Sequence, residues 1–182
     1  MSVWDIFDRN TYAHDARTQF LNWALVGSGA VDYAADARGW TIGAAAEWED
    51  GTWGLRAGAF QVSRRVNGLF LDPSITRAWQ MLGEVDRYTR LGGRPGAVRV
   101  IAGLSRTRQS SWGELLDPVS PVDFELNPRA YRTKAMLALN LEQEIADELG
   151  AFARLSWNDG RTQNWMFTEM DRAVSGGLSL KG

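Results

Sequence analysis

Eight charged residues lie on stretches of alternating polar and apolar residues, at positions that share one face of an extended strand. They are Glu47, Arg56, Glu84, Asp86, Arg99, Arg132, Lys134 and Arg154. Lys134 and Lys181 are the only lysines among 20 basic residues, so nearly all the cations are arginines. A guanidinium group can grip a carboxylate, a phosphate or a sugar hydroxyl through paired hydrogen bonds. Facing rows of arginine and carboxylate would create a field and offer hydrogen bonds to a polar solute passing between them.

The Asp-Gly dipeptide at 50–51 predicts a β-hairpin that positions the first two of these charges. Asp-Gly between alternating apolar residues is a strong hairpin signal, because the turn needs positive φ angles. Folding the chain there pairs Trp48 with Trp53 on an apolar face. On the other face, Glu47 and Arg56 become diagonal neighbours within reach of each other.

Two more hairpins and a final strand show the same alternation of polar and apolar residues. One hairpin joins 78–90 to 97–108, and the other joins 130–143 to 150–160. Leu82 and Tyr88 lie an even number of residues from Glu84 and therefore on the same face of the strand at 78–90. Because this face mixes apolar and charged residues, the sequence does not show which face of that strand points inward. A last strand begins at 172.

Before these strands, the stretch 15–25 places Phe20 and Trp23 on one helical face and has Asp15 as a candidate N-cap. It predicts a short helix within an N-terminal segment, 1–39, followed by the strands and loops of a β-barrel over 40–182. The helix would pack against the barrel or plug part of its lumen.

The connections between strands alternate strictly between short and long. Short ones lie at 50–51, 91–96 and 144–149, whereas long ones follow residues 60, 108 and 158. In an antiparallel meander this places every short turn at one end, which is typical of outer-membrane barrels. Strands of about ten residues or more fit a tilted membrane-spanning strand. Six aromatic residues near strand ends would form interfacial girdles: Trp40, Trp48, Trp53, Trp79, Tyr131 and Trp157.

Composition narrows the functional classes. A net charge of −2 argues against nucleic-acid binding, and the absence of Cys excludes thiolate metal sites and disulfides. His14 is the single histidine, so a zinc or iron site is not expected. An Asp-Gly turn at 158–161 could suggest calcium binding through Asp159, but such turns are common. Glu47 and Glu84 do not by themselves define a glycosidase pair. We expect no catalytic residues, no cofactor and no metal.

Several segments resemble the carbohydrate-selective porins of the OprB type. They are YAHDARTQFLNWAL, DYAADARGWTIGAAAEW, LGGRPGAVR, NLEQEIADELGAFARLSWNDGR and LSLKG, in the family's order. The resemblance implies an all-β, antiparallel up-and-down transmembrane β-barrel of 16 strands, which passes glucose and other small sugars through an arginine-lined constriction. About seven strands are countable here and no signal peptide is visible, so we expect a partial copy of the barrel.

The resemblance implies a passive porin in the cell outer membrane rather than an enzyme. Its expected partners are small sugars and outer-membrane lipid, with homo-oligomers as a further option. The eight charges would then line the pore. Two alternatives stay open at this point. One is a soluble β-barrel that binds a small ligand and buries the apolar face as a core. The other is a metal-ion porin of the same superfamily, selective for manganese.

Overall fold

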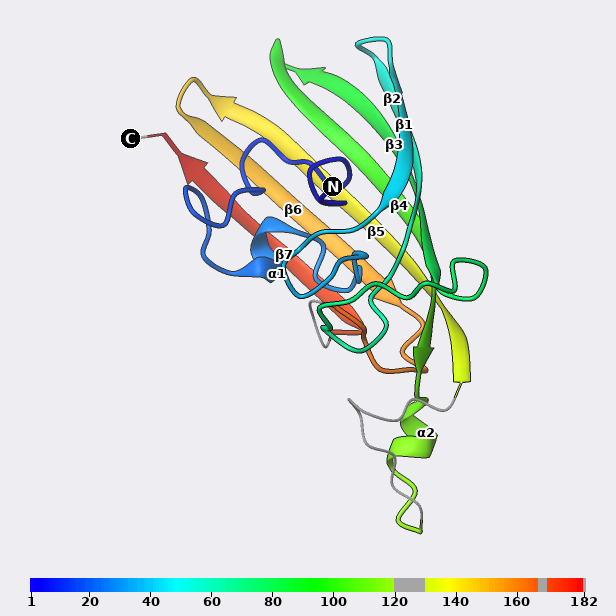
Figure 1. The fold of residues 1–182 in the computed structure, drawn as a ribbon. Coiled ribbons are helices and arrows are strands. Elements are labelled where there is room, and N and C mark those ends of the chain that lie inside the picture. The colour runs from blue at the N-terminus through cyan, green and yellow to red at the C-terminus, as the bar shows by residue number, and fades with distance from the viewer. Residues whose placement is uncertain (120–129, 167–169, 182) are drawn as a thin grey trace.

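The computed structural model describes residues 1–119, 130–166 and 170–181. Seven strands form one antiparallel sheet, in which each strand pairs with its neighbours in the sequence (Figure 1). The strands are β1 (Gly43–Glu49), β2 (Trp53–Phe60), β3 (Trp79–Leu91), β4 (Arg94–Gln109), β5 (Ala130–Ala146), β6 (Leu149–Asn158) and β7 (Arg172–Leu180). β1 and β7 are the two edges, so the described sheet is open. This confirms the expected all-β meander and is consistent with part of a porin barrel.

The two faces of the sheet differ as the period of two predicts. One face, which we call the outer face, carries exposed apolar side chains from every strand, among them Val85, Val100, Leu137 and Leu178. The opposite, inner face carries the buried polar and charged residues. Leu82 and Glu84 are both buried there, which resolves the ambiguity of β3. A water-soluble sheet would have the reverse arrangement, with its apolar face covered.

The short turns all lie at one end of the sheet and the long connections at the other (Figure 1). Positive φ angles at Gly51, Gly92 and Gly93 allow the first two tight turns. At the opposite end, a one-turn helix, α2 (Trp112–Leu115), follows β4 and begins with a capping box formed by Ser111 and Glu114. β1, β2 and β7 contain seven, eight and nine residues, fewer than the expected ten.

The chain before β1, residues 1–41, lies across the inner face and is called the N-terminal segment from here on (Figure 1). A hydrophobic core between the segment and the sheet joins Phe7, Val31 and Tyr33 to Phe60 and Ile101. Buried apolar area therefore holds the segment against a face that is otherwise polar.

The helix expected over 15–25 is wrong in its extent, because α1 spans only Trp23–Val26. Asp15 does not cap it. Its carboxylate accepts hydrogen bonds from the amides of Arg17 and Thr18 and forms a local turn. Such side chain to backbone bonds compete with helix formation. Asn22 is the N-cap of the short helix instead, through a hydrogen bond from the Ala24 amide.

The first hairpin differs from the expected register by two residues. Glu47 pairs directly with Arg56, and Trp48 pairs with Leu55 rather than Trp53. The turn is centred on Gly51 and Thr52, one residue later than expected, because the Asp50 amide donates to the Trp53 carbonyl at 3.1 Å. The Asp50 carboxylate also accepts hydrogen bonds from the amides of Thr52 and Trp53. A shift of two residues keeps every side chain on its expected face.

No helix among the described residues is long and apolar enough to cross a bilayer.

Candidate functional site

Arg56 is the centre of an ion network on the inner face. Its Nη1 atom lies 2.7 Å from a Glu84 oxygen and also contacts Asp86, while Nη2 lies 2.8 Å from Glu47. β1, β2 and β3 bring these groups together, because Glu47, Arg56 and Glu84 are successive Cα partners. The side chains of Arg56, Glu84 and Asp86 are almost completely buried, whereas Glu47 is about one third exposed. Glu47 also binds Arg9 of the N-terminal segment at 3.2 Å.

A second polar row crosses the sheet beside this network. Asp86, Arg99, Asn140 and Arg154 are successive partners on β3, β4, β5 and β6. Arg99 Nη2 donates to Glu142 at 2.9 Å. Within the described residues, the buried Nε and Nη1 atoms of Arg99 make no hydrogen bond. Arg99 Nε lies 3.8 Å from an Asp86 oxygen, so the guanidinium is held by charge on this side although it makes no hydrogen bond there.

Arg154 is committed to the N-terminal segment rather than to a neighbouring strand. It donates to the carbonyl oxygens of Leu25 and Ala13 at 2.8 and 2.7 Å, and its Nε lies 3.4 Å from the Asp8 carboxylate. Asp8 also accepts from Asn140 Nδ2 at 2.6 Å and from the Tyr33 hydroxyl at 2.8 Å. These contacts make Asp8 the principal polar anchor of the segment. Its backbone is left-handed, with a φ of 58°.

The other two expected site residues lie toward the long connections. Arg132 Nη2 contacts Glu114 of α2 at 2.6 Å. Lys134 is buried and donates to the Thr162 carbonyl at 2.8 Å and to Asn164. The structure thus joins five of the eight expected charges in one cluster, and gives Arg132, Lys134 and Arg154 separate partners.

Four of the six expected interfacial aromatics lie on the outer face, and two do not. Trp48 and Trp53 lie near the short turns on the outer face, and the Arg87 guanidinium packs over the Trp53 ring at 4.8 Å. Trp79 and Trp157 lie on the outer face near the long connections. The remaining two belong to other surroundings. Tyr131 donates to Asp72 at 3.1 Å and packs against the core, and Trp40 lines a cavity in the N-terminal segment.

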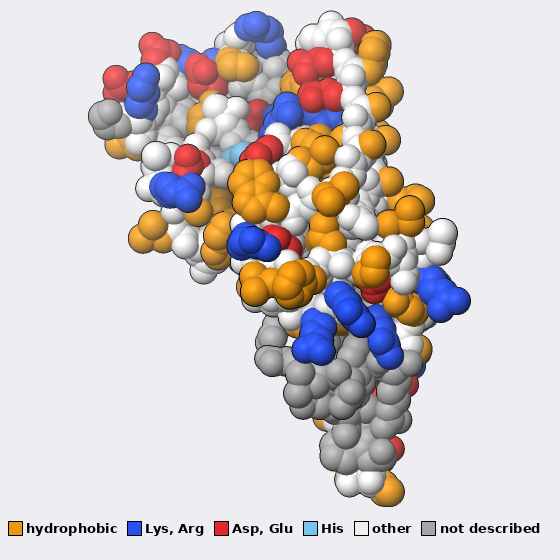
Figure 2. Space-filling view, in the orientation of Figure 1, with side chains coloured by type: hydrophobic (Ala, Val, Ile, Leu, Met, Phe, Trp, Pro, Cys, Tyr) orange, Lys and Arg blue, Asp and Glu red, His pale blue; other side chains and the backbone are white. Residues whose placement is uncertain are grey.

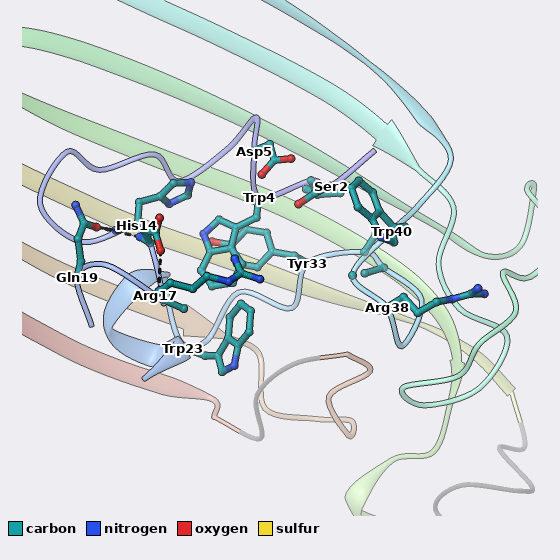
Figure 3. A pocket seen from close by; sticks show the side chains of 16 residues that line it. Ser2, Trp4, Asp5, His14, Arg17, Gln19, Trp23, Tyr33, Arg38 and Trp40 are labelled. Atoms are coloured by element: carbon teal, nitrogen blue, oxygen red, sulfur yellow. Dashed lines mark hydrogen bonds between the residues drawn. The ribbon is translucent and has the colours of Figure 1, made fainter. Parts of the chain in front are cut away.

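That cavity has a volume of about 490 Å³ and is lined entirely by residues between Ser2 and Trp40. Figure 3 shows Trp4 and Tyr33 at its centre, with Arg17 crossing in front of them and Arg38 pointing away. His14 also lines it, and burial lowers the pKa of the imidazole, with Arg154 adding to the effect and Asp8 opposing it. The imidazole is therefore held in its neutral form near pH 7.

A second cavity, of about 480 Å³, lies near the short turns. Thr11 and Tyr12 of the segment, Tyr88 of β3 and Glu142 of β5 contribute polar groups to it. Figure 2 shows acidic and basic side chains gathered at this end of the molecule. This polar cavity adjoins the ion network through Tyr88 and Glu142, which contact Arg56 and Arg99.

Asp159 serves the turn in which it lies. Its carboxylate accepts hydrogen bonds from the amides of Ala135 and Arg161, and Gly160 has a φ of 61°. No group of three potential metal ligands was found among residues 1–119, 130–166 and 170–181.

Sequence reasoning did not identify the residues that attach the N-terminal segment. Asn140 and Glu142 were on the expected inner face, and their parity was the signal available. Asp8 gave no signal, because residues 1–14 follow neither a period of two nor a helical period. The cavity was missed for the same reason.

Comparison with known proteins agrees with this architecture. The family model described as "Carbohydrate-selective porin, OprB family" matches residues 2–182. Neither the curated proteins nor the solved structures gave a match to the chain. The match spans all seven strands and the N-terminal segment, and it confirms the resemblance inferred from the sequence. The chain therefore belongs to the OprB family of carbohydrate-selective porins, which are outer-membrane transport channels rather than enzymes.

Proposed function

We propose that this chain forms part of the wall of an outer-membrane channel through which small neutral sugars diffuse passively. The observation that carries the proposal is the polarity of the sheet, whose outer face exposes apolar side chains while its inner face carries the ion network. This is the polarity of a barrel with lipid outside and a polar lumen inside. No reaction and no cofactor is required for passive diffusion.

The spacing of the outer aromatic residues supports placement in a bilayer. Trp53 pairs with Arg87 of β3, eight residues from Trp79 at the start of that strand. Eight residues span roughly 26 Å of strand, or roughly 20 Å of height at a tilt of about 40°. The apolar band of outer-membrane barrels is about 25 Å tall. Trp48 and Trp53 would thus mark one interface, and Trp79 and Trp157 the other.

The inner charges favour sugars over divalent cations. Glu47, Glu84 and Asp86 are all held by Arg56, so a cation would have to displace a guanidinium from a buried position. Hydroxyl groups can instead accept hydrogen bonds from arginine and donate to carboxylates without moving either partner. Glu47 is the residue of the network best suited to contact a solute, because about one third of its side chain is exposed.

Osmotic swelling of proteoliposomes tests this function. Vesicles that contain the chain are expected to swell in isotonic glucose faster than protein-free vesicles. Glu47→Gln should change the ratio of glucose to gluconate permeation, because it removes a partly exposed negative charge from the inner face. Asp147→Asn, which alters an exposed carboxylate in the short turn between β5 and β6, is the matched control and should leave the ratio unchanged. If protein-containing and protein-free vesicles swell at the same rate, the proposed function is wrong for this chain.

A further inference from the structure

The cavity within the N-terminal segment combines aromatic faces with hydrogen-bonding groups. Its volume of about 490 Å³ falls within the roughly 300–1,000 Å³ of small-ligand sites. Trp4, Trp23, Tyr33 and Trp40 all contribute to its lining. Four aromatic side chains from one short segment meet at this cavity, away from the outer face.

The rings are held in a fixed group with part of their surface accessible. Trp4 lies parallel to Tyr33 at a centroid distance of 6.0 Å, and against Trp23 at 4.8 Å. Trp23 and Trp40 are 54% and 56% exposed. Indole surface exposed at a cavity, rather than toward lipid, is available to a ligand that has an apolar face.

Polar groups stand beside these rings. Within the described residues, the Arg17 guanidinium and the Asp5 carboxylate make no hydrogen bond, and both side chains belong to the lining. Figure 3 shows Arg17 extending over the aromatic group. Some other polar groups of the cavity are already engaged. The Gln19 amide, for example, binds the amides of His14 and Asp15 and the Thr11 carbonyl. Arg17 and Asp5 therefore provide a free donor and a free acceptor.

The charge of the cavity favours an uncharged ligand. Asp5 and Asp15 balance Arg17 and Arg38, and Arg38 is further paired with Asp36 at 3.2 Å. A phosphate or carboxylate ligand would need excess positive charge, and an ammonium ligand would need excess negative charge. A neutral, hydroxyl-rich ligand needs neither.

We propose that this cavity binds the ring of a neutral monosaccharide, with its C–H face against the exposed indoles and its hydroxyl groups hydrogen-bonded to Arg17 and Asp5. The C–H bonds on one face of a pyranose carry partial positive charge and pack on the negative face of an aromatic ring. This inference rests on the proposed function and deepens it, because it places a binding site for the transported solute in the N-terminal segment rather than on a strand.

Saturation-transfer NMR and titration with D-glucose, using the full chain in detergent micelles, test the site. We expect a dissociation constant on the order of millimolar, since a site along a diffusion path must release its solute. Trp23→Ala should weaken glucose binding by about tenfold, as expected for the loss of one aromatic face. Arg17→Gln should also weaken it, and this variant breaks no hydrogen bond of the fold. Trp157→Ala, on the outer face, is the matched control and should bind like the wild type.

Several results would overturn the inference. They are the absence of glucose binding to the wild type, unchanged affinity in both Trp23→Ala and Arg17→Gln, and an equal loss in Trp157→Ala. Glucose 6-phosphate binding more tightly than glucose would also contradict a site for a neutral ligand. Vesicle swelling by the wild type separates this inference from the proposed function. If swelling persists while the cavity variants bind normally, the cavity assignment alone fails, whereas loss of swelling refutes the channel itself.

Discussion

Asp8→Asn should release the N-terminal segment from the sheet. The two carboxylate oxygens of Asp8 are both committed, one to Asn140 and Arg154, the other to the Ser28 amide at 2.6 Å and the Tyr33 hydroxyl. An asparagine must present an NH₂ group in place of one oxygen. This group would face either Asn140 and Arg154, which both donate here, or the Ser28 amide, whereas the Tyr33 hydroxyl can turn and accept. At least one buried donor would therefore face a donor whichever way the amide is turned. Asparagine also tolerates the left-handed backbone at this position, so the substitution tests the carboxylate rather than the φ angle.

The expected magnitude follows from burial. Each buried donor left without an acceptor costs about 1–3 kcal/mol. Removing one partner of a buried ion pair costs about 3–5 kcal/mol, because the remaining charge is uncompensated. Arg154 keeps its bonds to the Leu25 and Ala13 carbonyls, which limits the loss. We therefore expect a decrease of about 3–5 kcal/mol in the free energy of unfolding.

Urea unfolding in detergent micelles, followed by tryptophan fluorescence, measures this decrease. Limited proteolysis shows whether residues 1–41 become accessible first. Asp147→Asn is the matched control, because its carboxylate forms an exposed ion pair with Arg94 at 2.8 Å. Such pairs contribute about 0–1 kcal/mol. If Asp8→Asn and Asp147→Asn destabilise the chain equally, the anchoring role assigned to Asp8 is refuted.

Two other predictions concern the outer face and pH. Val100→Arg places a charge near the middle of the proposed apolar band and should cost about 2–4 kcal/mol of stability in vesicles, whereas Val100→Ile should leave assembly unchanged in a gel-shift folding assay. Burial lowers the pKa of His14 below the ordinary value of 6.5. The unfolded chain therefore binds the proton more readily, so the stability of the segment is complete above pH 6.5 and is lost as the pH falls through the folded-state pKa. Proteolysis of residues 1–41 should be faster at pH 5 than at pH 7.5, and His14→Gln should remove most of that difference.

The faces of the strands could be predicted from the sequence because burial leaves a period of two. Arg99 and Val100 are adjacent in sequence and lie on opposite faces, which is what alternation requires. The register of the first hairpin could not be predicted as reliably. Gly51 has a φ of 81°, but Asp50 is not among the described residues with positive φ, so the two-residue turn expected for Asp-Gly does not form.

The N-terminal segment was largely beyond prediction, because tertiary and local side-chain contacts determine its path. Asp15 and Gln19 bind nearby amides and replace the expected helix with turns. Asp8 is recognisable as an anchor only when Asn140 and Arg154, more than 130 residues later, are placed beside it. No local pattern reports such contacts.

The contacts of the inner charges indicate where selectivity would arise. Arg56 is saturated by carboxylates, and Arg154 and Lys134 are bound to backbone carbonyls. Freeing any of them to grip a sugar would leave its partners buried and unpaired, at a cost of about 1–3 kcal/mol for each group. Arg17 and Asp5 in the segment carry no such penalty, because neither side chain makes a hydrogen bond within the described residues. Glu84 and Arg154 hold the N-terminal segment in place through Asp8, whereas Arg56, Asp86 and Arg99 are held by one another and by neighbouring carboxylates. It follows that the N-terminal segment, together with the partly exposed Glu47 at the edge of the ion network, would distinguish one solute from another.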